Sequence, residues 1–232
     1  MRYFIVLLFC TSLVHISCTQ QHNSSVLGIV VDITDKDSTK VSAKKVFELG
    51  CPDNSIHSMS ITLTTISEYR HNPVQSWEFQ HKSWILSNSK QRKKEINSIL
   101  SQIDTALTNV RDQQSAKSNS YVFSSVLKAM NDLTENPKFY KTLLVVSDLQ
   151  DNTDRWSVFR EADLNMLMSD NSNTILKLTN ENPKYRYDGI TLYLIHNPRS
   201  PEDDRLFDIM SKAYKRFFQD RGANVLVIAN LE

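Results

Sequence analysis

Two unbroken apolar stretches, each followed at once by acidic and hydroxyl residues, constrain the fold of this chain more than any other feature. The first runs from Val26 to Val31 and is followed by Asp32. The second, in the strand 143–147, is apolar from Leu143 to Val146 and is followed by Ser147 and Asp148. A strand that is apolar at almost every position is typical of the centre of a parallel sheet, where helices bury both faces. The two stretches therefore predict an α/β sheet whose central strands end in carboxylates.

The rest of the chain alternates short apolar runs with longer segments of helical period. This pattern predicts an open, mostly parallel, doubly wound sheet of about six strands flanked by helices. Further strands are expected at 56–69, at 76–86 as an antiparallel edge, at 189–198 and at 223–231, and helices at 39–49, 96–110, 121–133, 156–168 and 201–221. The remainder of 153–188 reads as an insertion or irregular loop. With no internal repeat, residues 26–232 are expected to form one domain.

The N-terminus predicts export. Arg2 precedes an apolar run to about Val14, which is shorter than the about 20 residues that a membrane-spanning helix needs, so residues 1–17 are expected to be a signal peptide. Ile16 and Ser17 before Cys18 resemble the lipobox of bacterial lipoproteins. An ordinary secretory signal cut near Ser17 is the alternative.

The resemblance to a lipobox implies that Cys18 carries a lipid and that residues 18–25 form a polar tether. The protein would then be anchored in the bacterial cell envelope, and the lack of an aspartate after Cys18 favours the outer over the inner membrane. Cys10 would leave with the signal, and Cys51 would be the one cysteine left besides the lipidated one. A lone thiol cannot form an internal disulfide, so stability must come from a packed core.

Charge and motif content exclude several functions. The 27 basic and 26 acidic residues are mixed along the chain, which predicts no nucleic-acid partner. The sequence has no G-x-S-x-G elbow, no Gly-rich phosphate loop and no H-E-x-x-H motif, and it contains only 4 glycines. We therefore expect the protein not to be an enzyme.

The acidic strand ends predict a ligand site. In open α/β sheets ligands bind at the C-terminal ends of strands, where Asp32 and Asp148 would converge if their strands are neighbours. Close carboxylates repel each other unless a cation or a proton intervenes, and hydroxyls beside them make the oxygen-rich shell that Mg²⁺ prefers. The alternative is a structural role for each residue, as a helix cap or turn residue.

The order of these motifs resembles that of a von Willebrand factor A-like domain. The metal-ion-dependent adhesion site of that family combines Asp-x-Ser-x-Ser after the first strand, a Thr before a helix and an Asp after the fourth strand. Here "DITDK" supplies Asp32 and Thr34, "SNSYVFSSVL" supplies Ser120, and "VVSDLQD" supplies Asp148. The resemblance covers residues 26 to 231 and implies that these four residues form a site for Mg²⁺ or Mn²⁺.

The chain departs from the family pattern at three places. Lys36 stands where the third hydroxyl belongs, Leu149 replaces the glycine that commonly follows the last Asp, and "KSNS" replaces Gly-Gly-Thr. Two arrangements are open. Either an oxygen of Asp35, Asp37 or Ser38 takes the third place, or Lys36 pairs with one of the site aspartates and replaces the ion, which leaves a metal-free binding face.

The resemblance implies a binding module that is anchored to the membrane by lipid and holds a protein partner on the face where the strands end. In one variant the protein belongs to a larger envelope machine, with 153–188 and Trp156 as contact elements. The alternative is a metal-dependent phosphatase of haloacid dehalogenase type, because "IVVDITDKDST" resembles a strand followed by Asp-x-Asp-x-Thr. Thr34 occupies the place of the second Asp, which in that family is the general acid.

Overall fold

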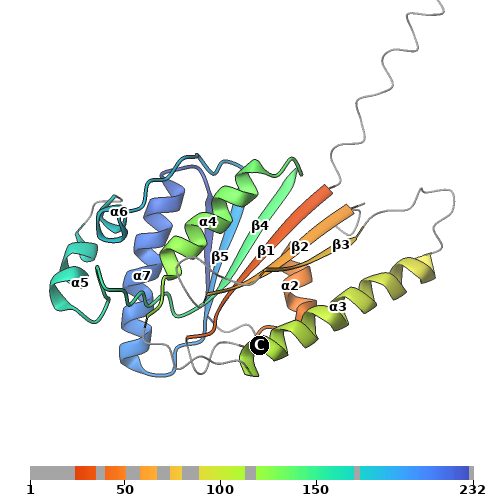
Figure 1. Ribbon diagram of the computed structural model, residues 1–232, viewed down its shortest axis with the longest axis horizontal. Helices are drawn as coiled ribbons and strands as arrows, with labels where there is room; N and C mark the ends of the chain where they lie inside the picture. The colour runs from red at the N-terminus through yellow and green to blue at the C-terminus, as the bar shows by residue number, and fades with distance from the viewer. Residues whose placement is uncertain are drawn as a thin grey trace, which may run out of the picture.

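The computed structural model describes residues 24–34, 40–50, 58–66, 74–79, 89–112, 119–169 and 173–229 of the 232-residue chain. Its centre is a six-stranded sheet in the order β3-β2-β1-β4-β5-β6 (Figure 1). Only β3 is antiparallel to its neighbour, so the predicted α/β class with a mostly parallel sheet is confirmed. The strands are β1 (Ser24–Asp32), β2 (Ser58–Ile66), β3 (Val74–Phe79), β4 (Tyr140–Val146), β5 (Ile190–His196) and β6 (Asn224–Ala229).

Helices cover both faces of the sheet, which therefore has two hydrophobic cores. On one face α2 (Ala43–Gly50) and α3 (Ser89–Asp112) pack on β1, β2 and β4. On the other face α4 (Val122–Glu135) and α7 (Pro201–Gln219) pack on β1, β4 and β5. The short helices α5 (Glu161–Met168) and α6 (Thr174–Thr179) lie beyond α7 (Figure 1).

The first strand is buried on both faces, as its apolar run predicts. Val26 and Val30 belong to the core under α4 and α7, whereas Leu27, Ile29 and Val31 belong to the core under α2 and α3. Because successive side chains of a strand point to opposite faces, both cores draw on the same six-residue run. This explains why apolar and polar residues do not alternate along its sequence.

Two predicted elements begin at other residues than expected. The predicted edge strand 76–86 is a strand over Val74–Phe79, and its remainder, 80–86, lies outside the described residues. The predicted helix 156–168 begins only at Glu161. Thr153 binds the backbone of Trp156 at both its N–H and its carbonyl, which makes a tight turn where the periodicity predicts helix. Trp156 itself, predicted as a possible contact element, is 1% exposed and belongs to the core.

Several predictions concern residues outside the described ranges. These are the export signal, the lipid attachment site Cys18 and most of the tether, and also Lys36 and the alternative ligands Asp35, Asp37 and Ser38. Within the described ranges, no helix combines the length and the apolar character that crossing a membrane requires.

Candidate functional site at the strand ends

The ends of β1 and β4 meet, as predicted. The two strands are parallel neighbours in which Val31 pairs with Val146, so Asp32 and Ser147 follow at the same edge of the sheet. The Ser147 hydroxyl donates a hydrogen bond of 3.0 Å to Oδ2 of Asp32, across 115 positions of sequence. Asp32 is only 1% exposed, so its carboxylate depends on protein partners rather than on bulk water.

Hydroxyl groups from three segments of the chain surround Asp32. The Thr34 hydroxyl and backbone N–H donate to Oδ1 at 2.6 Å and 2.9 Å, and the buried Ser120 hydroxyl lies 3.4 Å from Oδ2. Ser120 is positioned by a two-way backbone bridge to Asn152, with N···O distances of 2.8 Å and 3.1 Å. Three of the four predicted site residues therefore form one hydrogen-bonded group, together with Ser147.

Asp148, the fourth predicted residue, lies at the same end of the sheet in a tight turn. Its Oδ1 accepts a hydrogen bond of 2.9 Å from the backbone N–H of Gln150, and its side chain is half-buried. Burial first, and then the charges of Asp151, Asp32 and Asp148, raise the pKa of the Tyr214 hydroxyl well above its usual value. Asp148 thus contributes to the negative field of the site.

Asp151 is a site residue that the sequence reasoning missed. It is buried, and its Oδ2 accepts a hydrogen bond of 3.1 Å from the backbone N–H of Phe123 in the first turn of α4. Burial raises the pKa of Asp151 well above its usual value, although the backbone N–H groups of Phe123 and Val122 oppose this shift; the charge of Asp32 adds to it. The one sequence hint is that Tyr121, at the N-cap position of α4, supplies no side-chain cap, which leaves the N–H groups of the first turn to other partners but does not say which.

Leu149 sets the turn that carries these side chains. It has φ +60° and is completely buried, and its N–H donates to the Ser147 hydroxyl at 2.9 Å. This is the left-handed region, which costs a residue with a side chain roughly 1–2 kcal/mol. Leucine thus adopts the conformation that glycine takes freely, and its side chain packs in the core beside α4 and α7.

A second polar group joins the same loop to α7. His196 ends β5, is 1% exposed, and places Nε2 3.1 Å from both carboxylate oxygens of Asp203. Although burial acts to raise the pKa of Asp203, hydrogen bonding from the Arg199 N–H and the contact with His196 lower it overall. Gln150 donates to Oδ1 of Asp203 at 3.0 Å, so the loop after β4 is fixed from both sides.

The donor set of the Asp32 group fits a hard cation in its chemistry. No group of three or more His, Cys, Asp or Glu residues in the described ranges is placed to hold a metal ion. The Asp32 group instead offers one carboxylate and three hydroxyls, from Thr34, Ser120 and Ser147. Mg²⁺ often binds through one or two carboxylates and keeps several waters, so oxygen ligands of this kind suit it.

No family model and no curated protein matches this chain. The geometry of the strand ends is therefore what bears on function.

Proposed function

We propose that this chain is a von Willebrand factor A-like binding module that holds a protein partner on the face formed by the ends of β1 and β4 and the start of α4. The observation that carries the proposal is the buried Asp32 carboxylate, on which hydroxyls from Thr34, Ser120 and Ser147 converge. A strand end that served only as a turn would not need to gather three distant segments.

The proposal includes Mg²⁺ or Mn²⁺ at this face. Asp32, Thr34 and Ser120 would hold the ion together with Asp148, and the ion would supply a positive charge that attracts a carboxylate of the partner. The all-oxygen character of the group supports this assignment. The lipid on Cys18 would keep the module at the bacterial envelope, in the outer rather than the inner membrane.

The proposal includes no catalytic step. Incubation of the chain with Mg²⁺ and p-nitrophenyl phosphate separates it from the phosphatase alternative. We expect no turnover above background. Turnover that disappears in Asp32→Asn would favour the phosphatase instead.

The direct test is capture of envelope proteins by cross-linking in wild type and two variants. Asp148→Ala removes a half-buried carboxylate at the face, whereas Asp208→Asn, the matched control, removes an exposed carboxylate on α7 that pairs with Lys212. We expect Asp148→Ala to lose the captured protein and Asp208→Asn to keep it, with unchanged circular dichroism in both. Equal capture by both variants would contradict the proposal.

A further inference from the structure

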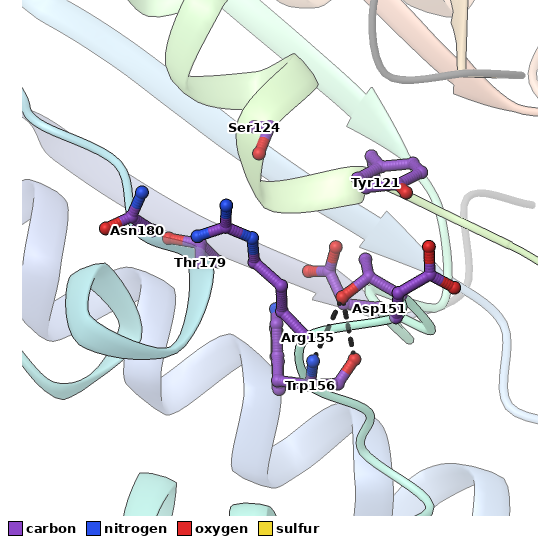
Figure 2. Close-up of a pocket in the computed structure, with 9 residues that line it drawn as sticks. Tyr121, Ser124, Asp151, Arg155, Trp156, Thr179 and Asn180 are labelled. Atoms are coloured by element: carbon purple, nitrogen blue, oxygen red, sulfur yellow. Dashed lines mark hydrogen bonds between the residues drawn. The ribbon is translucent and has the colours of Figure 1, made fainter.

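A pocket of about 220 Å³ lies beside the Asp32 group, between the start of α4, the turn after Asp151 and the end of α6 (Figure 2). Asp151 forms part of its wall and connects it to the site described above. The lining residues are Tyr121, Ser124, Asp151, Thr153, Asp154, Arg155, Trp156, Thr179 and Asn180. The pocket is smaller than the about 300–1,000 Å³ of sites for drug-sized ligands, so it suits a single side chain or a small acid.

Trp156 brings an unused hydrogen-bond donor to this pocket. The residue is 1% exposed, and its indole Nε1 has no hydrogen-bond partner in the described part of the chain. Figure 2 shows the indole edge-on below Arg155, with its nitrogen at the end nearer Thr179. Because nearly all buried polar atoms have a partner, an orphaned donor in a pocket wall points to a ligand with an acceptor.

The backbone that carries the indole is held in place by hydrogen bonds. The Thr153 hydroxyl accepts from the Trp156 N–H at 3.1 Å and donates to its carbonyl at 2.9 Å (Figure 2, dashed lines). Asn152 next to it is bridged to both Ser120 and Ser157. A donor fixed in this way loses little conformational entropy when a ligand binds.

The second donor is Arg155. Its exposed side chain extends along the pocket toward Thr179 and Asn180 (Figure 2), and it forms no ion pair with another described residue. A guanidinium offers several N–H groups in a fixed plane that matches the two oxygens of a carboxylate. The pocket therefore combines one buried neutral donor with one charged donor at its rim.

The acidic residues of the wall decide the class of anion. Asp154 is exposed at the rim, and Asp151 is buried behind it. A phosphate would place about two negative charges beside these carboxyl groups with one guanidinium to offset them. A carboxylate brings one charge, which Arg155 can balance.

We propose that this pocket binds a carboxylate, which accepts hydrogen bonds from Trp156 Nε1–H and from the Arg155 guanidinium. The carboxylate can come from an acidic side chain of a peptide segment or from a small free acid. The site is separate from the Asp32 group and does not depend on a metal ion.

The test follows the indole N–H of Trp156 by nuclear magnetic resonance in the ¹⁵N-labelled full-length chain in detergent. The chain has three tryptophans, and the signal that Trp156→Phe removes identifies the one in the pocket. The probes are N-acetyl-Gly-Glu-Gly amide, its Gln counterpart and glutarate. We expect the Glu peptide to shift this signal saturably, and the Gln peptide to bind roughly tenfold more weakly or worse, because it lacks the charge-assisted bond.

Two variants complete the test. Arg155→Gln should weaken binding of the Glu peptide about tenfold, whereas Arg205→Gln, which removes an exposed arginine on α7, should leave it unchanged. Equal binding of glutarate and the Glu peptide would identify the source as a free acid, and preference for the peptide would identify it as a protein segment. No saturable shift, or the same shift with the Gln peptide or in Arg155→Gln, would overturn the proposal.

Failure of this proposal can be told from failure of the binding-module proposal. Asp32→Asn should still show the saturable shift of the Trp156 signal, because Asp32 does not line the pocket. Asp148→Ala tests the strand-end face alone.

Discussion

The left-handed conformation of Leu149 predicts an unusual ranking of two substitutions. Leu149→Ala and Leu149→Gly both remove a completely buried side chain, which costs about 2–5 kcal/mol of the free energy of unfolding. Alanine must still adopt φ +60°, whereas glycine adopts it freely. Removal of this backbone strain stabilises the Gly variant by roughly 1–2 kcal/mol. This exceeds the about 0.4–1 kcal/mol of stability that glycine loses because it makes the unfolded chain more flexible. The Gly variant should therefore be the more stable by roughly 0.5–1 kcal/mol.

Leu127 supplies the matched control for this ranking. It is also a buried leucine, 3% exposed, but it lies inside helix α4, where glycine is about 1 kcal/mol less favourable than alanine. Urea unfolding of all four variants, followed by far-ultraviolet circular dichroism, should give opposite rankings at the two positions. If the Gly variant is less stable than the Ala variant at both positions, Leu149 carries no backbone strain that glycine relieves, and the reasoning is refuted.

Four further predictions concern caps, titration and metal. Ser200→Ala removes the acceptor of the Asp203 N–H at the start of α7 and should lower the free energy of unfolding by about 1 kcal/mol, as measured by urea unfolding. Because the pKa of Asp151 is raised, its ionisation opposes folding. Thermal melts should show stability falling as pH rises above about 4, and Asp151→Asn should remove that fall. The pKa of Asp203 is lowered, so its ionisation favours folding. This stabilisation is present above about pH 4 and is lost in acid, and the Asp203→Asn variant should not show that loss. Millimolar Mg²⁺ should raise the melting temperature, chelation should reverse this, and Asp32→Asn should abolish it; no shift in the wild type would favour the metal-free face.

The parts of the fold that could be predicted from sequence are those fixed by local pattern. The apolar run of β1 predicts a central strand because burial on both faces leaves no alternation. Ser200, Pro201 and Gly222 predict the ends of α7, and the structure confirms the cap at Ser200 and a positive φ of +95° at Gly222. The meeting of Asp32 with Ser120 is what the resemblance implies, and the local pattern of either segment does not predict it.

The parts that could not be predicted depend on contacts between distant segments. Asp151 caps α4 from 28 positions away, so no local window reveals it. The helical period after Trp156 is overridden by the turn that Thr153 makes and by the bridge from Asn152 to Ser157. Leu149 has no local turn signal, since leucine rarely adopts positive φ. In each case tertiary packing outweighs local preference.

Asp151 also restricts how this surface can diversify. One carboxyl group caps α4, lies 3.5 Å from the Tyr214 hydroxyl of α7, and forms a wall of the pocket. A substitution there cannot alter the pocket without also disturbing both helices. New ligand preferences should therefore arise first at rim residues such as Asp154 and Arg155, which are exposed and can change one at a time. Among descendants of this chain the buried residues of the wall would stay the same, and the residues of the rim would vary.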